Sequence, residues 1–217
     1  MYYSGKLFTQ VQDVRQGLIA DWPMNEGNGT TIFDKAGANN GTINGATWVG
    51  NQLKFDGVND IIDCGAASLV VTNNFTFSFW FKSGALGQVN KYILNKDAGK
   101  HSIIYGYVAN SIEFFSGSYS GANPRTSSTI SIPDLNWHHI IYSYDGGVMN
   151  RYKDNILIGS VPIVFSLAIW APSLIIGGAS LTVANTNGFL SDIRVYNRAL
   201  TPTEATNLYN FQKQQYP

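Results

Sequence analysis

The sequence predicts an all-β protein, a two-sheet antiparallel β-sandwich with a short C-terminal helix. Glycine accounts for 22 of the 217 residues and aromatic residues for 13%, which suits β-branched and aromatic strands joined by tight turns. Apolar and polar side chains alternate in residues 75–82 and 137–144, with the period of two expected of strands. Turn signals between the apolar runs recur at the spacing of a sandwich.

The composition also excludes several classes of function. Hydrophobic residues make up 44% of the chain and charged residues 13%, which is enough apolar material for a sizeable core. The 14 basic and 14 acidic residues cancel, and Lys and Arg form no cluster. The electrostatic footprint of a nucleic-acid-binding protein is therefore missing. No apolar run approaches the roughly 20 residues of a membrane helix, so no membrane insertion is expected.

The N-terminal sequence bears on where the protein is made. The stretch MYYSGKLFTQVQDVRQ lacks the apolar core of a secretory signal. We expect synthesis in the cytoplasm without a signal peptide, with a secreted or cell-surface protein as the alternative. Cys64 is the only cysteine, so no disulfide within the chain is possible, and we interpret it as a small buried apolar residue.

The first half of the chain begins with an arm, residues 1–16, whose apolar side chains follow no clear period. The first strand is expected at residues 17–22. Residues 25–47 are dense in Gly, Asn and Thr, which predicts turns and short strands. The clearest strand, residues 75–82, is expected to face the core with Phe75, Phe77, Phe79 and Phe81. Its opposite face would carry Thr76, Ser78 and Trp80.

The second half continues as strands and ends in a helix. Strands are expected at 91–95, 102–108, 111–115, 137–144, 149–153, 156–160, 173–176 and 189–196. Asp154-Asn155 would close a hairpin. Thr201, Pro202 and Glu204 combine an N-cap, a proline at the first helical position and a capping-box acid, which predicts a helix start. The simplest division is an N-terminal arm (1–16), one sandwich domain (17–210) and a polar C-terminal tail (211–217).

Four separated segments match the pattern of one known family. They are DWPMNEGNGTT from Asp21, FDGVNDII from Phe55, WHHI from Trp137 with YDG from Tyr144, and DIRVYNRAL from Asp192. In this order they resemble the laminin G-like domains of the concanavalin A-like lectin and glucanase group. The resemblance implies a jelly roll with adjacent first and last strands. It does not fix the function, because this sandwich hosts lectins, adhesins, hydrolases, lyases and virion proteins.

An enzyme of this family would be expected to be a polysaccharide hydrolase or lyase. Glycoside hydrolysis usually needs two carboxyl groups about 5 to 9 Å apart. The three glutamates, Glu26, Glu113 and Glu204, form no such pair with another acid on a predicted strand. A lyase would need a histidine or tyrosine base, but the resemblance makes His138 and His139 a structural feature of their strand. No catalytic residue is therefore assigned.

The resemblance also makes calcium the most credible bound ion, since this fold often carries one. Calcium needs six to eight oxygen ligands. The candidate ligands are Asp34, Asn39, Asp56, Asp60 and Asp192. Asn59 and Ser191 stand where the family has a second acid, and each removes a charge. The alternative is that these residues only make turn hydrogen bonds. No other cofactor is expected.

A sugar-binding surface needs exposed aromatic faces beside planar polar groups. The candidate platforms and partners are Trp80, Tyr105, Tyr107, Tyr119 and Arg125. The alternative is that most of these aromatic rings lie in the core or form cross-strand pairs.

The connection at residues 161–172, VPIVFSLAIWAP, is unusually apolar for a loop that the family commonly keeps short and polar. Exposed, such a run favours aggregation unless a partner covers it. A protein–protein contact is one hypothesis, made by Ile163, Phe165, Ile169 and Trp170, joined by Tyr2, Tyr3 and Phe8 of the arm. An extra strand or a lid over the protein's own core is the other.

Together these features predict a non-catalytic structural or adhesive β-sandwich. We expect it at the exterior of a virion, as a decoration or fibre-associated domain of a phage or virus. Its partner would be another protein or a second copy of itself, with a surface glycan as a further ligand. The alternatives are a free carbohydrate-binding lectin and a polysaccharide hydrolase or lyase.

Overall fold

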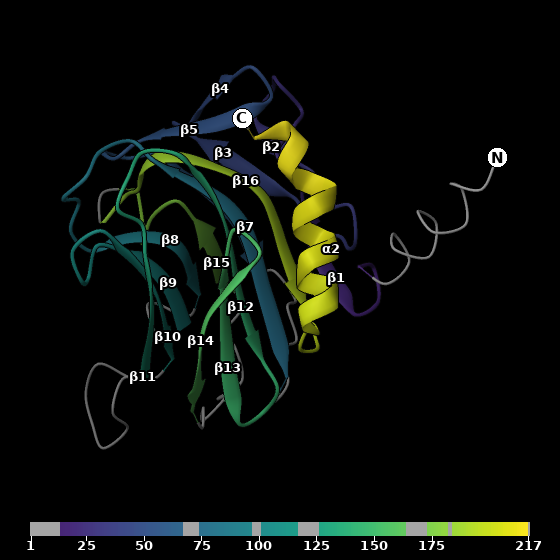
Figure 1. Cartoon of the computed structure of the whole chain (residues 1–217). Helices are drawn as coiled ribbons and strands as arrows, with labels where there is room; N and C mark the ends of the chain where they lie inside the picture. Colours follow the sequence, from purple (N-terminus) through teal and green to yellow (C-terminus); the bar gives the residue numbers. More distant parts are fainter. Residues whose placement is uncertain are drawn as a thin grey trace.

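The computed structural model describes residues 14–66, 74–96, 101–116, 126–163, 173–181 and 184–216. Within these residues the predicted architecture is confirmed: two antiparallel sheets face each other, and one short helix follows the last strand. Figure 1 shows the two layers and the helix, α2, lying against the outside of one of them. The N-terminal strand β1 (Leu18–Trp22) runs beside the last strand, β16 (Asn187–Tyr196), as the family resemblance implied.

The first sheet carries α2 on its outer face. In spatial order it contains β14 (Ile156–Pro162), β13 (Val148–Lys153), β12 (Trp137–Tyr144), β7 (Phe75–Ser83), β16, β5 (Gln52–Asp56) and β4 (Thr47–Val49). One long edge of β16 has two partners: residues 187–190 pair with β5, and residues 193–196 pair with β1. The junction between these two partners lies at residues 191–192.

The second sheet closes the other side of the core. In spatial order it contains β11 (Thr126–Ser131), β10 (Ser111–Ser116), β9 (His101–Tyr105), β8 (Lys91–Lys96), β15 (Ser173–Ile176), β6 (Ile61–Ala66), β3 (Gly41–Asn44) and β2 (Thr31–Ile32).

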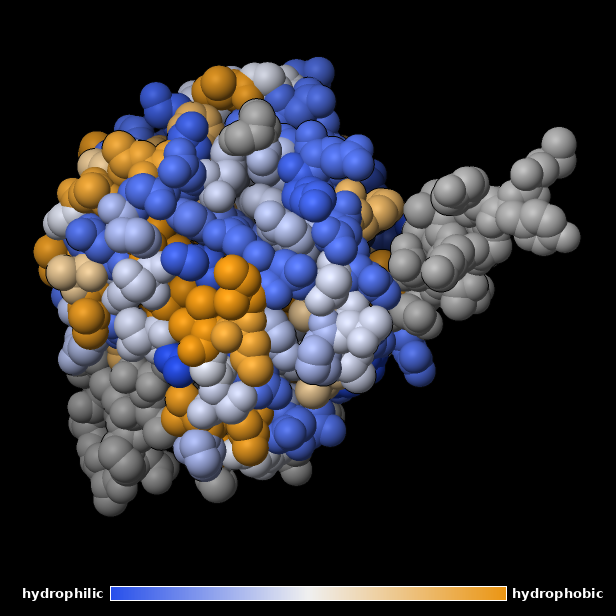
Figure 2. Space-filling view, viewed as in Figure 1, coloured by the Kyte–Doolittle hydropathy of each residue, from blue (hydrophilic) through white to orange (hydrophobic). Residues whose placement is uncertain are grey.

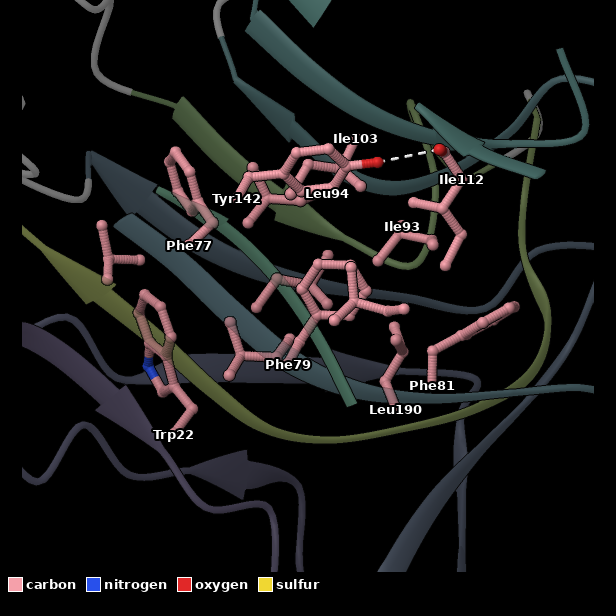
Figure 3. Packing of buried hydrophobic residues seen from close by; sticks show 14 of the residues in the cluster. Trp22, Phe77, Phe79, Phe81, Ile93, Leu94, Ile103, Ile112, Tyr142 and Leu190 are labelled. Atoms are coloured by element: carbon pink, nitrogen blue, oxygen red, sulfur yellow. Dashed lines mark hydrogen bonds between the residues drawn. The ribbon is translucent and has the colours of Figure 1, made fainter. Parts of the chain in front are cut away.

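The core between the sheets forms where the alternating pattern predicted it. The phenylalanines of β7 and the residues Ile140, Tyr142 and Tyr144 of β12 are all buried in it. Figure 3 shows four of these side chains, Phe77, Phe79, Phe81 and Tyr142, packed between the layers. The hydroxyl of Tyr142 donates to the carbonyl oxygen of Ile112 at 2.8 Å, across from one sheet to the other. That bond satisfies a polar group which burial would otherwise leave unpaired.

The hairpin of β13 and β14 also agrees with the prediction. Asp154 and Asn155 have φ values of 50° and 70°, the left-handed pair that a two-residue type I′ turn requires. The register then slips between Arg151 and Tyr152, leaving Ile158 as an additional residue of β14. Such a bulge bends the strand and increases its twist.

The C-terminal segment differs from the predicted tail. The helix α2 (Pro202–Gln212) continues past residue 210, and a 3₁₀ turn, η1 (Lys213–Gln215), follows it. Gln212 and Tyr216 are buried against the first sheet. A second apolar cluster joins the helix to that sheet, and it contains Val14, Ile141, Tyr152, Tyr196, Leu200, Ala205 and Leu208. The segment 211–216 is therefore part of the folded domain.

The capping box at the start of α2 gives a stability prediction. The side chain of Thr201 accepts from the backbone N–H of Glu204, and Glu204 accepts from the backbone N–H of Thr201. The change Thr201→Ala should lower the free energy of unfolding by about 1 kcal/mol. Urea denaturation measures it. Thr203→Ala, at an exposed position inside the same helical turn, is the control and should cost much less. Equal losses in both variants would contradict a capping role.

A candidate binding cleft under the C-terminal segment

Trp80 anchors the C-terminal segment to the first sheet. Its ring lies on the outer face of β7, as predicted, but it is only 2% exposed. Tyr216 stacks on it at 4.1 Å between ring centroids, with His139 at 5.0 Å and Tyr209 at 5.7 Å also stacked against it. The indole N–H donates to the side-chain oxygen of Gln212 at 3.1 Å. Trp80 is thus a structural residue, and the prediction that it forms an exposed sugar platform is wrong.

A bulge in β16 supplies one wall of the cleft. Ser191 pairs with Trp80 and Arg194 with Ser78, so Asp192 and Ile193 together stand opposite one residue of β7. Asp192 has a left-handed φ of 48°, an uncommon conformation for a residue other than glycine. Strained residues of this kind gather at functional sites. The bulge falls at the junction where β5 ends and β1 begins beside β16.

The Asp192 carboxylate is held beneath the C-terminal segment. The Tyr216 hydroxyl donates to its Oδ2 at 2.6 Å and lies 2.8 Å from the Ser191 Oγ. Ser191 in turn donates to the carbonyl oxygen of Pro23. Burial raises the pKa of the Asp192 carboxyl group. The nearby charge of Arg194 lowers this pKa, but burial is the larger effect. Asp192 therefore lies within one polar network and not in a turn of the kind expected for a calcium ligand.

Arg194 links two carboxylates from different strands. Its Nε donates to Asp21 Oδ1 at 3.0 Å, and its guanidinium lies 3.7 Å from Asp192 Oδ1. Burial disfavours the charged guanidinium, but the two neighbouring carboxylates outweigh burial and raise the pKa of Arg194. No carboxylate pair was predicted from the sequence. The fold nevertheless brings Asp21 of β1 and Asp192 of β16 onto one cavity.

Two adjoining cavities lie beside these residues. The first, here called the charged cavity, has a volume of about 290 Å³ and is lined by Asp21, Lys35, Asp192, Arg194 and Phe211, among others. The second, called the amide cavity, has a volume of about 260 Å³ and is lined by Asn51, Gln52, Ser191 and Tyr216. Asn25 and Gln215 line both. We call the two cavities together the terminal cleft.

Phe211 is the exposed aromatic residue of the terminal cleft. It is 53% exposed at the wall of the charged cavity, and the Arg194 guanidinium lies 6.0 Å from its ring centroid. A cation at this distance is attracted to the π face of the ring. Phe211 was not predicted as a site residue, because residues 211–217 have the composition of a polar tail. The continued spacing of Leu208 and Phe211 along the helix was the available signal.

The remaining calcium candidates serve the turns in which they lie. The Asp34 carboxylate accepts from the backbone N–H groups of Asp21, Ala36, Gly37 and Asn39, and these bonds outweigh burial and lower its pKa. Asp60 Oδ2 accepts from the backbone N–H of Asp56 at 2.7 Å, and burial raises the Asp60 pKa. Asp56 caps its own turn by accepting from the N–H of Val58.

These positions do not form one ion-binding cluster. Among the residues that the structure describes, no group of three or more His, Cys, Asp or Glu side chains could hold a metal ion. The Asn39 side chain donates to Asp34, so it completes a turn network with that carboxylate. Calcium binding by this chain stays a prediction.

The other residues predicted to bind glycans differ in how exposed their side chains are. Tyr105 is fully buried in the core, so it presents no platform, and that prediction is wrong. Tyr107 is 49% exposed, with its ring edge-on to Phe115 at 5.1 Å. Tyr119 and Arg125 lie outside the described residues.

The predicted partner interface is mostly outside the described residues, which do not include Tyr2, Tyr3, Phe8, Phe165, Ile169 or Trp170. Ile163 is described, and it is 3% exposed within the core cluster. Its carbonyl oxygen accepts from the Tyr144 hydroxyl, so Ile163 belongs to the core and its assignment to an interface is wrong. An exposed apolar patch lies instead on the edge strand β14, at Ile156, Leu157 and Ile158. Figure 2 shows apolar side chains gathered over β14.

The pKa values of the two adjacent histidines of β12 are shifted in opposite directions. His138 lies between Asp154, 2.6 Å from its Nδ1, and Asp134, 3.0 Å from its Nε2. Although burial lowers the His138 pKa, the two carboxylates outweigh it, and the pKa is raised. His139 is stacked on Trp80 and shares a hydrogen bond with the Ser78 hydroxyl. Burial lowers the pKa of His139 to about 3, so this ring is neutral.

The comparison with known proteins identifies the family. A model of the concanavalin A-like lectin/glucanases superfamily matches residues 56–206, most of the chain. The chain belongs to this superfamily, in agreement with the resemblance found in its sequence. No curated protein sequence matches it. Among the described residues, no helix has the length and apolar character needed to cross a membrane.

Solved structures with a similar fold include both binding domains and enzymes. Domain 4 of the arabinanase AbnA from Geobacillus stearothermophilus, in complex with arabinotriose, is 22% identical with a TM-score of 0.68, covering 88% of this chain and 98% of that one. The binding domain of botulinum neurotoxin DC, in complex with rat synaptotagmin II, is 13% identical with a TM-score of 0.72, covering 91% and 52%. The Trypanosoma rangeli sialidase, in complex with sialic acid, is 16% identical with a TM-score of 0.68, covering 97% and 38%.

At these identities the likeness shows the fold alone. The chain spans about half of the neurotoxin chain and a smaller share of the sialidase chain. The chemistry of this chain's own cleft must therefore carry any assignment of function.

The neutral His139 predicts a loss of stability in mild acid. Below its ordinary pKa of 6.5 the unfolded imidazole binds a proton, whereas the folded one resists protonation down to about pH 3. The free energy of unfolding should therefore fall by up to about 1.4 kcal/mol for each pH unit between pH 6 and 4.5. The pKa of His138 is raised in the folded state, so this residue adds only a small slope of the opposite sign near pH 6.

Urea denaturation at pH 6.0 and 4.5 measures this effect. In His139→Gln the slope should largely disappear, whatever the absolute stability of the variant. In His138→Gln it should persist. A slope that is unchanged by His139→Gln would contradict a buried neutral imidazole.

Proposed function

We propose that this chain is a non-catalytic binding module and that its terminal cleft binds carbohydrate. The observation that carries the proposal is the exposed ring of Phe211 beside a cleft of planar polar side chains. A sugar has an apolar face of C–H groups and a rim of hydroxyls. An aromatic face and amide or carboxylate groups complement those two surfaces, and concave sites of this kind are the usual ligand pockets.

The aromatic ring and the two carboxylates of the charged cavity are supplied by a helix and by strands. Phe211 comes from α2, which the Trp80 stack and the capping box fix on the sheet. Asp21 and Asp192 come from strands, and Arg194 links them. A site supported by rigid elements loses little conformational freedom when a ligand binds. The arabinotriose complex of the similar arabinanase domain supports the choice of ligand class, as an analogy.

A polysaccharide hydrolase is the second candidate function. The observation that favours it is the placement of Asp21 and Asp192 on one cavity, together with the raised pKa of Asp192. A general acid with a raised pKa and a second carboxylate are the usual parts of a glycosidase. We rank this candidate lower because Arg194 donates a hydrogen bond to Asp21 and forms an ion pair with Asp192. The Tyr216 hydroxyl also donates a hydrogen bond to Asp192.

A protein partner and the location complete the proposal. The apolar patch on β14 supports a protein contact, since exposed apolar patches commonly mark such surfaces. We propose that the module lies at the exterior of a virion. A secreted or cell-surface lectin is the alternative. Detection of the protein in purified particles by mass spectrometry, against its presence in culture supernatant, tests the location.

The change Phe211→Ala should weaken glycan binding by about tenfold or more. Half of the ring is already exposed, so the melting temperature should change little. A glycan array selects the ligand, and calorimetry measures its affinity. Tyr107→Ala is the matched control, because Tyr107 is equally exposed but does not line the cleft. Loss of binding in Tyr107→Ala with retention in Phe211→Ala would move the site to the other ring.

Incubation with arabinan and other plant polysaccharides should release no reducing ends. The expected result follows from the engagement of both carboxylates by Arg194. A colorimetric reducing-sugar assay measures release. Release that Asp192→Asn abolishes would establish the hydrolase and overturn the binding module.

A further inference from the structure

The amide cavity has a chemistry of its own. Its lining consists of the amide side chains Asn25, Asn51, Gln52 and Gln215, with Ser191 and Tyr216, and contains no charged residue. Asn51 and Gln52 come from the turn between β4 and β5 and from the start of β5, while Gln215 comes from η1. The cavity thus joins the turn before β5 to the C-terminal segment.

The four amide groups are available to a ligand. Within the part of the chain that the structure describes, the side chains of these four residues make no hydrogen bond to other protein groups. Ser191 and Tyr216, in contrast, are already joined to each other and to Asp192. A ligand that enters the amide cavity therefore meets four amides that need not break an internal bond to receive it.

Amides select for uncharged ligands with many hydroxyl groups. Each amide offers both donors and an acceptor, and a sugar hydroxyl can likewise donate and accept. A phosphate, sulfate or carboxylate is bound best by Arg, Lys or a set of backbone N–H groups. The lining of the amide cavity supplies no cationic side chain. A neutral sugar fits this lining better than an acidic one.

The two cavities are neighbours, because Asn25 and Gln215 line both. One sugar residue placed on Phe211 in the charged cavity would therefore have its neighbour in the chain beside Asn51 and Gln52. We propose that the amide cavity is a second sugar subsite, so that the terminal cleft binds a neutral oligosaccharide of two or more residues. This proposal rests on the proposed function of the cleft.

Affinity as a function of chain length tests the second subsite. The probes are arabinose, arabinobiose and arabinotriose, a parallel series of glucose, cellobiose and cellotriose, and di- and trigalacturonate as acidic ligands. Protein NMR titration measures the weak members and calorimetry the tighter ones. In a neutral series that binds, the disaccharide should bind about tenfold more tightly than the monosaccharide, as two or three additional hydrogen bonds would give. The galacturonates should bind more weakly.

Variants assign that gain to the amide cavity. Asn51→Ala and Gln52→Ala should each reduce the affinity for the disaccharide and leave that for the monosaccharide unchanged. Gln214→Ala is the control: it is the neighbour of Gln215, is exposed, and lines neither cavity. It should bind every probe like the unmodified protein. Thermal melting of each variant verifies that it is folded.

The two proposals fail in different ways. Equal affinity for mono-, di- and trisaccharide, or a gain that survives both Asn51→Ala and Gln52→Ala, overturns the second subsite and leaves Phe211-dependent binding in place. Tighter binding of galacturonates overturns the neutral ligand class. Absence of binding by every probe overturns the subsite together with the proposed function.

Discussion

The burial of Trp80 on the outer face of the first sheet is the constraint on which the terminal cleft depends. An indole ring exposed in the middle of a sheet would leave a large apolar surface in water. Tyr209 and Tyr216 of the C-terminal segment cover the ring, and the side-chain oxygen of Gln212 accepts a hydrogen bond from the indole N–H. These contacts fix a segment of mostly polar sequence on the sheet. Phe211 and Gln215 reach the cleft because their neighbours are held in this way.

The bulge in β16 provides the second half of the cleft. In a regular strand Ser191 and Asp192 would point to opposite faces. The additional residue lets both contact the Tyr216 hydroxyl, while Ile193 still packs into the core. Arg194 then returns to the outer face and meets Asp21 of β1. One backbone irregularity thus places two strands and the C-terminal segment around the same cavity, at the cost of a left-handed aspartate.

The sequence was sufficient for the features that local patterns encode. Alternation in residues 75–82 identified the core face of β7, the pair Asp154-Asn155 identified a hairpin turn, and Thr201 with Glu204 identified the start of α2. The family resemblance supplied the adjacency of β1 and β16. Each of these depends on residues close in sequence or on a pattern known from the family.

The cleft was not predicted, because it depends on contacts between distant residues. Alternation placed Trp80 on the outer face, but it could not show that Tyr216 would cover it. Asp21 and Asp192 are far apart in the chain, so a search along single strands did not pair them. Tyr105 was mistaken for a surface ring, since an aromatic residue in a strand has the same sequence signal on either face.

The bulged edge strand β14 has a consequence for how copies of this protein can be arranged. A straight apolar edge would let sheets of neighbouring molecules join strand to strand and grow into fibres. The additional residue Ile158 bends the edge and disturbs the regular spacing of its backbone donors and acceptors. The apolar side chains at that edge can thus take part in a contact of limited size, while the bulge opposes the addition of further molecules strand to strand. A dense array of copies on one surface could then stay ordered without fusing into a continuous sheet.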